Sequence, residues 1–465
     1  MLKEFSSLHD FLVLDAKGLA GTVLHCPECG KDHSIPIGKM KVGIGLANDV
    51  PKTAEEILGH APEKTALIYD HSIENLVLHA FEPVKDALRI EYVPRGRSGF
   101  WLDSTDVLGD ETARIVSDMH ADLVIGAGSG VIADLTKWAA TKAGLPFILY
   151  GTAASMNAHA SVTATITRGD VKVSEWLDPA SAVFMDTGII RSAPKPMRLA
   201  GLGDLVARSI CNADWLLANF IRGKDFCPVP YLLTALGEGR YLGVAQGIGS
   251  GDLDAADILA EASLVSAVSM TMMAGETSPS SGTEHVFSHF WDLQTHTDRA
   301  TKNLHGVQVG IGTVLSYTVW EYMRELDVTK IDPEELLRNR PSLESILEDN
   351  KSRYGETAVL FDEAVKAKWI SDEEYVPYIR NIIDRWGEMW KTLSPYIGDK
   401  AAIRHALIAA GFKLKLSMIG RTADQVLESI RYGARYRSRY TILDLAGELG
   451  VLPQAAEEIF FRSDL

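Results

Sequence analysis

Hydrophobic positions in the first part of the chain follow two alternating patterns. Short runs of β-branched and aromatic residues predict strands, and apolar residues three and four positions apart predict helices between them. The expected strands cover 65–70, 88–93, 122–125 and 146–150, and the expected helices cover 73–81, 110–119 and 131–143. This alternation is typical of parallel βαβ units, in which ligands bind at the carboxyl ends of the strands.

The pattern changes near residue 195, where the strand signals fade and long amphipathic stretches begin. Helices are expected at 198–219, 307–325, 373–393 and 401–410, with polar, Pro-containing connections near 326–343. The sequence therefore predicts an α/β domain at 1–195 and an all-α domain at 196–465. Within the first domain, residues 1–40 are expected to form an added, hairpin-like segment.

Composition narrows the classes of protein that the chain can represent. With 465 residues, 46% hydrophobic and 23% charged, it has the composition of an ordinary globular protein large enough for two cores. A formal net charge of −16 argues against nucleic acid or an anionic membrane as a partner, but a locally positive pocket can still bind a phosphorylated small molecule. We find neither a bilayer-spanning apolar run nor a signal pattern, and four cysteines are too few for a disulfide framework. These features predict a cytoplasmic protein.

A glycine-rich turn follows the third expected strand. Gly126, Gly128 and Gly130 lie before the next helix, where backbone N–H groups and the helix N-terminus can approach a pyrophosphate. The third glycine comes earlier than in the usual dinucleotide fingerprint, so an ordinary tight βα turn is the alternative. Asp70, at the end of an earlier strand, can accept hydrogen bonds from an adenosine ribose, which would favour NAD over NADP. A helix N-cap is the alternative role for Asp70.

Small and hydroxylated residues follow the last expected strand. Among them, Thr152, Ser155 and Ser161 can donate hydrogen bonds to phosphate or amide groups of a ligand. A polar loop that caps the following segment would explain the same residues without a ligand.

Three residues after the α/β domain form a ligand set for a divalent metal. Asp204, His285 and His305 offer one carboxylate and two imidazoles and leave positions open for water or substrate. Zinc, nickel and iron all suit this set, and such a metal can act as a Lewis acid on an alcohol oxygen. His289 lies four residues after His285 on the same helical face, where it can relay a proton or hold a second substrate oxygen. A satisfied core histidine is the alternative.

Another candidate metal site lies within the first forty residues. His25, Cys26, Cys29 and His33 include the Cys-x-x-Cys spacing of a zinc knuckle. Since one such pair alone is a weak signal, a hairpin turn with reduced cysteines is the alternative.

The order of these motifs resembles the metal-dependent polyol dehydrogenases, which include glycerol dehydrogenase and share a fold with dehydroquinate synthase. The motifs are Gly-x-Gly-Ser-Gly-x-x-x-Asp-x-x-Lys, Thr-Ala-Ala-Ser, Gly-x-Gly-Asp, Glu-His-x-x-x-His and His-Gly, and the resemblance covers about residues 37–450. The segment 437–445, Arg-Ser-Arg-Tyr-Thr-Ile-Leu-Asp-Leu, is similar to the C-terminal hallmark of the bacterial glycerol-1-phosphate dehydrogenases.

The resemblance implies an N-terminal dinucleotide-binding domain, a helical C-terminal domain as in dehydroquinate synthase, and a metal in the cleft between them. It implies that Asp204, His285 and His305 bind one zinc, nickel or iron ion, and that His289 and Asn157 face the substrate. With the residues named above, the expected contacts of NAD or NADP are Asp70, Gly126, Gly128, Ser129, Gly130, Asp134, Thr152, Ser155 and Ser161. The expected reaction is reversible hydride transfer between glycerol 1-phosphate and dihydroxyacetone phosphate, in a homo-oligomer.

One position departs from the family pattern. Relatives usually carry Asp in a Ser-x-Asp-Gly context, where this chain has Asn157 followed by Ala158. An amide can hydrogen-bond a hydroxyl but cannot act as a base or add negative charge, so an unphosphorylated polyol such as glycerol is an alternative substrate. Two other classes are alternatives: a phosphate-eliminating synthase, whose members usually have Glu in place of Asp204, and a non-catalytic binding protein that retains the fold.

Overall fold

The computed structural model describes residues 2–84, 86–93, 102–169, 171–273, 276–297 and 302–465. The contacts divide the chain into two compact units. The first contains Met1–Leu205, Pro228–Glu276 and Ala409–Gly411, and the second contains Val206–Cys227, Thr277–Ile408 and Phe412–Leu465. The units are therefore not two contiguous halves, because the segment Pro228–Glu276 packs with the first unit although it follows residue 195.

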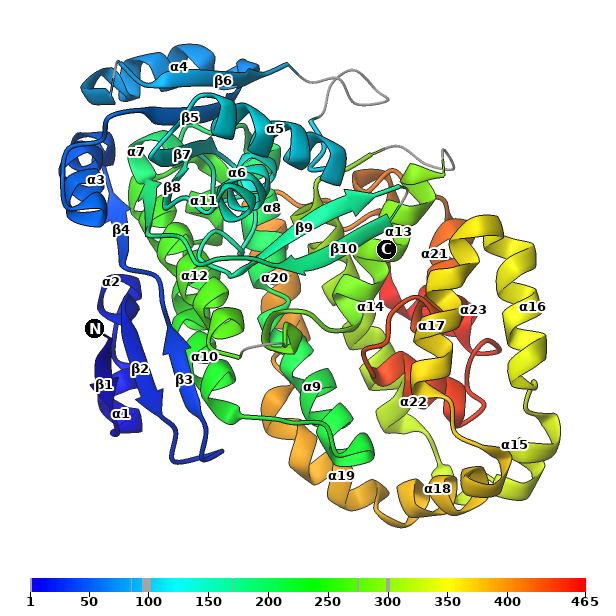
Figure 1. Ribbon diagram of the computed structural model, residues 1–465. Coiled ribbons are helices and arrows are strands. Elements are labelled where there is room, and N and C mark those ends of the chain that lie inside the picture. The colour runs from blue at the N-terminus through cyan, green and yellow to red at the C-terminus, as the bar shows by residue number, and fades with distance from the viewer. Residues whose placement is uncertain (1, 85, 94–101, 170, 274–275, 298–301) are drawn as a thin grey trace. The chain divides into compact units, whose positions relative to one another are not determined.

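A six-stranded parallel sheet forms the centre of the first unit (Figure 1). In spatial order its strands are β4 (Lys39–Gly43), β11 (Ala182–Asp186), β8 (Phe147–Gly151), β7 (Leu123–Gly128), β5 (Thr65–Asp70) and β6 (Leu88–Tyr92). β7, β8 and β11 are buried along their whole length, as expected for apolar strands covered on both faces. The predicted parallel βαβ architecture is confirmed.

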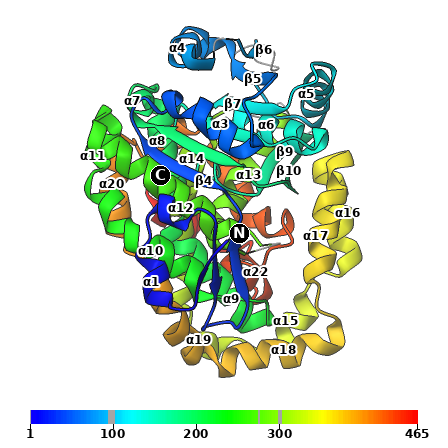
Figure 2. The ribbon, with the colours of Figure 1, turned by 60° about the vertical axis from the view of Figure 1, so that its left-hand side comes forward.

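Helices connect the strands of this sheet. They are α3 (Val50–Leu58), α4 (Glu74–Ala80), α5 (Asp106–Asp118) and α6 (Gly130–Ala143). α5 begins where the Thr105 hydroxyl accepts a hydrogen bond from the N–H of Leu108 at 3.1 Å, and α6 ends at Gly144 in the left-handed conformation (φ +65°). α5 and α6 pack side by side, with α6 against β7 (Figures 1 and 2).

The core on the α3 and α4 side of the sheet packs aromatic side chains among aliphatic ones. The rings of Phe81 and Tyr150 meet edge to face with centroids 4.8 Å apart, and Phe184 packs on the other side of Tyr150. Burying each such side chain contributes about 1.5–3 kcal/mol. The Tyr150 hydroxyl donates to Asp186 at 2.5 Å, and burial, with that carboxylate, raises the pKa of Tyr150 so that the hydroxyl stays a donor.

Sequence periodicity misses two parts of this unit. The edge strand β4 and its neighbour β11 lie in short apolar runs without a distinctive period. The hairpin of β9 (Thr163–Arg168) and β10 (Val171–Trp176) pairs antiparallel, with Gly169 at φ +61° in its turn. Short strands that are only partly covered give weak sequence signals, which is why tertiary pairing decides them.

The first residues form a second, three-stranded sheet. Its order is β1 (Lys3–Phe5), β2 (Thr22–His25) and β3 (Asp32–Ile35), with α1 (Leu8–Leu12) and α2 (Ala16–Leu19) between β1 and β2. β2 and β3 form an antiparallel hairpin, and β1 pairs parallel with β2.

Further helices belong to the described part of the first unit. They are α7 (Thr187–Ile190), α8 (Lys195–Leu205), α10 (Pro228–Gly243), α11 (Ala245–Ser250) and α12 (Leu253–Thr271). α12 packs on α8, α10, α11, β3 and β4. These contacts explain why a helical segment beyond residue 195 belongs to the first unit.

The second unit is helical throughout its described residues, as predicted for the C-terminal part of the chain. Its helices are α9 (Arg208–Arg222), α13 (Thr283–His296), α14 (His305–Glu325), α15 (Pro333–Asn339), α16 (Leu343–Tyr354), α17 (Ala358–Lys368), α18 (Asp372–Asp384), α19 (Trp386–Leu393), α20 (Lys400–Ala410, with its last two residues in the first unit), α21 (Ala423–Tyr432), α22 (Ile442–Glu448) and α23 (Ala456–Ser463).

Three predicted boundaries in the helical part are wrong. The stretch 198–219 is divided between α8 and α9, and 373–393 is divided between α18 and α19, because apolar periodicity continues across both breaks. The expected connection 326–343 contains α15, where Pro333 occupies the first helical turn and the Asp332 side chain caps the N–H of Glu334 at 3.0 Å. Proline at that position starts a helix instead of interrupting one.

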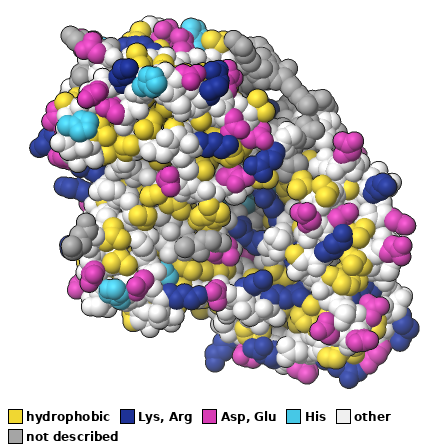
Figure 3. All heavy atoms as spheres, in the orientation of Figure 1, with side chains coloured by type: hydrophobic (Ala, Val, Ile, Leu, Met, Phe, Trp, Pro, Cys, Tyr) yellow, Lys and Arg dark blue, Asp and Glu magenta, His cyan; other side chains and the backbone are white. Residues whose placement is uncertain are grey.

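The surface and the helix lengths agree with the composition. No helix in the described part of the chain is long and apolar enough to cross a membrane. On the face shown in Figure 3, acidic and basic side chains are interspersed, so the net charge of −16 is not gathered into one field there.

Candidate metal and cofactor sites

Two predicted metal ligands lie at the starts of two neighbouring helices of the second unit. His285 is in the first turn of α13 and His305 is the first residue of α14. The two helices pack together, and the centroids of the two imidazole rings lie 5.2 Å apart. Both rings therefore stand at helix starts, and the packing of the two helices brings them together.

The ring of His285 is oriented by its neighbour in the chain. Nδ1 of His285 lies 2.8 Å from a carboxylate oxygen of Glu284, which also accepts a hydrogen bond from the N–H of Gly282 at 2.6 Å. A carboxylate accepts and does not donate, so it holds the proton on Nδ1 and leaves Nε2 as the metal-binding nitrogen. The sequence analysis missed Glu284, although the Glu-His pair in the motif is a usable signal.

The ring of His305 is oriented through a hydroxyl. Nδ1 of His305 lies 3.0 Å from the Ser288 hydroxyl, which donates its own proton to the Gln308 side-chain oxygen at 3.1 Å. Because that hydroxyl has only one proton, it must accept from Nδ1–H of His305. Nε2 of His305 is therefore also left for a metal. No sequence pattern singled out Ser288 or Gln308.

His289 joins these two imidazoles, as its spacing predicts. Its ring centroid lies 6.1 Å from that of His285 and 5.3 Å from that of His305. The three rings thus form one cluster in the second unit, and His289 stands beside the two predicted ligands on the face of α13 that carries His285.

Buried carboxylates hold the start of α13 in place. Asp214 accepts hydrogen bonds from the N–H of Thr283 at 2.7 Å and of Ile442 at 2.8 Å. Burial, with the nearby charge of Glu284, raises the pKa of Asp214 to about 7. A Cβ at Gly282 would lie 2.6 Å from an oxygen of Asp214, so only glycine fits before the Thr-Glu-His sequence.

The third predicted ligand, Asp204, lies in α8 of the first unit and is buried. Its Oδ2 accepts a hydrogen bond from the backbone N–H of Asn157 at 2.9 Å, and its backbone carbonyl accepts one from the Asn157 amide at 3.3 Å. A Cβ at Gly201 would lie 1.9 Å from the carbonyl oxygen of Ala154, so the glycine lets α8 contact this loop. Asn157 thus positions Asp204, a role that the sequence did not suggest.

The predicted phosphate loop joins β7 to α6. Ser129 precedes α6 without capping it, because its hydroxyl pairs with that of Ser155. The first N–H groups of this 14-residue helix are therefore available to an anion.

The glycines of this loop have different roles. A Cβ at Gly126 would lie 2.2 Å from Oγ1 of Thr136, and one at Gly128 would lie 2.6 Å from Ile132, so both allow α6 to pack on β7. A Cβ at Gly130 would meet only the flexible side chain of Met156, at 3.2 Å or more. Gly130 is therefore the glycine at which packing on β7 does not exclude a side chain, and cofactor contacts of Gly126, Gly128 and Gly130 stay predictions.

Behind the loop lies a buried polar network. The Lys137 ammonium donates to the carbonyls of Ala158 at 2.7 Å and Thr163 at 2.9 Å. The Ser161 hydroxyl lies within hydrogen-bond distance of the same two carbonyls, which occupies its proton. Burial raises the pKa of Asp134 and lowers that of Lys137. Ser161 thus belongs to this network, Asp134 lies close enough to Lys137 for their charges to interact, and a direct cofactor contact of either stays a prediction.

Two further cofactor candidates lie at the ends of β8 and β5, the strands on either side of β7. The N–H of Thr152, after β8, donates to the carbonyl of Gly128 at 2.9 Å. Asp70, at the end of β5, accepts from the N–H of Ser72 at 2.8 Å, so the alternative N-cap role is observed. Its other carboxylate oxygen has no hydrogen bond to the residues described here, and the ribose contact stays a prediction.

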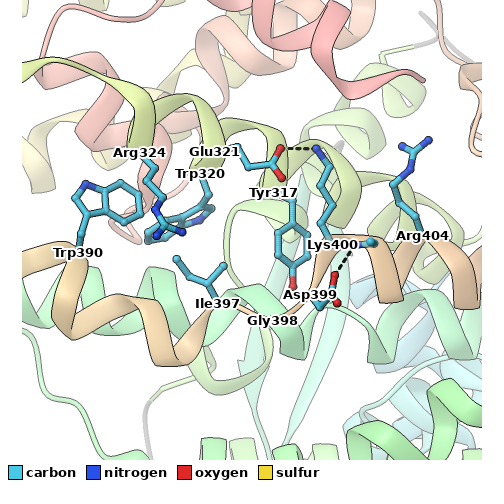
Figure 4. A pocket seen from close by; sticks show the side chains of 11 residues that line it. Tyr317, Trp320, Glu321, Arg324, Trp390, Ile397, Gly398, Asp399, Lys400 and Arg404 are labelled. Carbon is cyan, nitrogen blue, oxygen red and sulfur yellow. Dashed lines mark hydrogen bonds and ion pairs between the residues drawn. The ribbon is translucent and has the colours of Figure 1, made fainter.

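A groove of about 420 Å³ lies between α14, α19 and α20 (Figure 4). Lys400 pairs there with Glu321 at 2.5 Å, and Tyr317 donates to the carbonyl of Ser209 at 3.0 Å. Tyr317 is twelve residues beyond His305 on α14, or about 18 Å along the helix. The groove is therefore separate from the histidine cluster.

The site combines a parallel sheet, an uncapped helix N-terminus after β7 and two histidines whose Nδ1 atoms are both hydrogen-bonded. These features define the class of cofactor-dependent dehydrogenases, and comparisons with known proteins give the same class. Residues 44–194 match the family model described as iron-containing alcohol dehydrogenase. The NAD(P)+ glycerol-1-phosphate dehydrogenase of Pyrococcus abyssi is 32% identical over 270 residues, which cover 56% of this chain and 77% of that protein. The enzyme of the same name from Geobacillus stearothermophilus is 27% identical over 69% of this chain and 81% of that protein.

The chain therefore belongs to the iron-containing alcohol dehydrogenase family, in the branch of the glycerol-1-phosphate dehydrogenases. The match to the enzyme of Geobacillus thermodenitrificans, 32% identical over 45% of this chain, spans only about half of that protein's length, 53%. A probable glycerol dehydrogenase from Sinorhizobium meliloti shares the fold, with a TM-score of 0.58 and 15% identity over 92% of this chain and 98% of that one.

Proposed function

We propose that this protein is a cytoplasmic, homo-oligomeric dehydrogenase that interconverts glycerol 1-phosphate and dihydroxyacetone phosphate with NAD or NADP. The observation that carries the proposal is the pair of imidazoles, His285 and His305, held 5.2 Å apart with both Nδ1 atoms engaged. A structural histidine needs no such control of its tautomer, whereas a metal ligand does.

The proposed metal ligands are Asp204 from the first unit and Nε2 of His285 and His305 from the second. One carboxylate and two neutral imidazoles fit zinc, nickel or iron and leave coordination positions for substrate. When bound, the metal supplies Lewis-acid polarisation of the alcohol oxygen, and the nicotinamide supplies the hydride acceptor. Asn157 keeps the Asp204 carboxylate in position through its N–H.

The proposed cofactor site is the start of α6. Its N–H groups and the space over Gly130 receive the pyrophosphate, and Ser129 and Ser155 line the approach to it. Asp70 offers one carboxylate oxygen to the ribose, from the strand next to β7.

His289 is the proposed proton carrier. Its place beside both metal-binding imidazoles allows it to accept the proton that leaves the substrate hydroxyl, or to hold a second substrate oxygen.

Arg437 is the proposed contact of the substrate phosphate. Its guanidinium is half-buried, and burial lowers the pKa of this side chain. Among the described residues that act on this pKa is Asp292, three residues after His289 on α13. A partly desolvated guanidinium is a group that binds phosphate strongly.

The test is a product assay with metal-loaded protein. NAD or NADP should be reduced with sn-glycerol 1-phosphate and much less with its enantiomer or with glycerol, without release of inorganic phosphate. Faster oxidation of glycerol would establish the unphosphorylated alternative, and phosphate release would establish the synthase.

A further inference from the structure

The hairpin of β2 and β3 contains a cluster of metal-ligand residues in the first unit. Cys26 directly follows β2, Cys29 lies in the turn, and His33 lies in β3. The N–H of Gly30 donates to the carbonyl of Cys26 at 3.0 Å, and Gly30 has φ +71°. This left-handed residue reverses the chain immediately after Cys29 and keeps the two thiols on one side of the turn.

The ligand atoms of these residues are spaced as a metal requires. Sγ of Cys26, Sγ of Cys29 and a ring nitrogen of His33 all lie within 4.8 Å of one another. Sγ of Cys29 and Nε2 of His33 are 3.3 Å apart. A tetrahedral zinc with Zn–S of about 2.3 Å and Zn–N of about 2.0–2.1 Å would have a sulfur–nitrogen edge of about 3.6 Å, so small shifts admit the ion.

The second nitrogen of His33 is engaged as in zinc proteins. Nδ1 lies 3.1 Å from the backbone carbonyl of Met272, which follows α12. A carbonyl only accepts, so Nδ1 carries the proton and the lone pair of Nε2 points toward the thiols. His25 differs, because its exposed ring pairs with Asp32 at 2.7 Å outside the cluster.

A fourth ligand is available at the start of α10. Cys227 immediately precedes Pro228, the first residue of that helix. α10 packs along α12, to which it is joined through the short α11, so its first turn lies beside the end of α12. The carbonyl of Met272 that orients His33 is at that end.

We propose that Cys26, Cys29, His33 and Cys227 bind one structural zinc ion. Thiolates select zinc over hard cations, and four protein ligands leave no position for a substrate. The site joins the small N-terminal sheet to the start of α10, and the N–H of Ala16 in α2 donates separately to Glu261 of α12 at 2.5 Å. It is separate from the proposed catalytic metal, and His25 from the sequence motif takes no part.

The experiment measures zinc content and zinc release in the full-length protein. Modification of the thiols by an organic mercurial, with a chromogenic chelator present, should release one equivalent of zinc from the wild type. The His305→Ala variant should release the same amount, since this site does not use the catalytic ligands. Cys29→Ser and His33→Ala should lose that equivalent, whereas the matched controls His25→Ala and Cys211→Ser should retain it.

Zinc-edge X-ray absorption of wild-type protein loaded with one zinc keeps the proposal testable if the variants misfold. A shell of three sulfurs and one nitrogen is expected. Absence of sulfur from the shell, no zinc released by the mercurial, or a Cys26–Cys29 disulfide in protein prepared under reducing conditions would each overturn the proposal. Loss of zinc from His25→Ala but not from His33→Ala would do the same.

Discussion

At the scale of single residues, the orientation of the histidines in the proposed catalytic site depends on hydrogen-bond partners for which the sequence gives little signal. Residue type predicted Asp204, His285 and His305 as a ligand set, and the four-residue spacing predicted that His289 lies beside His285. Neither property could predict that Asn157 would bind Asp204, because that contact joins residues 47 positions apart through a loop conformation. Its position in the family pattern suggested substrate contact instead.

The first prediction concerns Glu284, which holds the proton on Nδ1 of His285. In Glu284→Gln the side chain can donate its amide N–H to Nδ1 and favours the tautomer with the proton on Nε2. Metal affinity should fall about 10- to 100-fold. Competition with a calibrated chelator measures the change. The matched control is Glu238→Gln, which changes a half-buried glutamate of the first unit in the same way. Equal affinity in wild type and Glu284→Gln would show that Glu284 does not orient the ligand.

The second prediction concerns the proposed phosphate contact. Arg437→Met keeps much of the side-chain volume and removes the charge. Loss of a charged hydrogen-bonding partner costs about 1.5–3 kcal/mol, so kcat/KM for glycerol 1-phosphate should fall about 10- to 150-fold. The value for glycerol should hardly change. A similar loss for both substrates would place the phosphate elsewhere.

At the scale of elements, we expect the glycines of the turn from β7 into α6 to differ in role, with some needed for packing and Gly130 for ligand binding. Gly130→Val should weaken NAD binding at least tenfold, because the added side chain fills the approach to the helix N-terminus. Its melting temperature should stay close to wild type. Gly128→Ala should instead destabilise the protein by about 1–3 kcal/mol, since the new Cβ meets Ile132. Calorimetry of binding and of unfolding distinguishes the two effects, and the reverse pattern would contradict these roles.

A pH-dependent prediction belongs to α10. Burial raises the pKa of Glu238 to about 7 from an ordinary value of 4.5. A raised carboxyl pKa means that the folded state holds this proton more tightly than the unfolded state does. The contribution of Glu238 to stability is therefore greatest below about pH 4.5 and is lost as the pH rises through 7. Glu238→Gln should therefore gain about 1–2 kcal/mol over wild type at pH 8 and little at pH 4.5. Urea unfolding at the two pH values measures this difference, which would be absent if the carboxyl were well solvated.

Elements also show what periodicity can and cannot predict. The central strands β5 and β8 and the helices α6 and α14 are long or apolar enough to be found within two residues of their ends. The break at Val206 and the start of α15 were not predicted, because a change of helix axis leaves the apolar spacing intact. Such boundaries depend on tertiary packing.

At the scale of the whole molecule, the sequence predicted the order of an α/β part and a helical part but not the chain's path through them. Sequence patterns contain no information about which sheet or helix a distant segment will pack on. The return of Pro228–Glu276 to the first unit therefore had to come from the structure.

A prediction at this scale follows from the proposed metal ligands, which come from both units. Saturating metal should raise the melting temperature of the wild type, because a ligand bound to the native state alone stabilises it by about 2.7 kcal/mol at 100 times Kd. Asp204→Ala should lose this increase although both histidines are retained. Differential scanning calorimetry with and without metal measures it, and an undiminished increase in Asp204→Ala would remove Asp204 from the ligand set.

The discontinuous first unit also constrains how the protein can be made. When the ribosome has synthesised residues up to Leu205, all strands of the large sheet have been made. The helix α12, against which β3 and β4 pack, has not. At about 5–20 residues per second, the roughly 70 residues to Glu276 require about 4–14 s. During that interval the nascent sheet exposes apolar surface that only later helices cover. We therefore expect nascent chains to need chaperone protection. A gene fragment that ends near residue 205 should likewise yield insoluble protein.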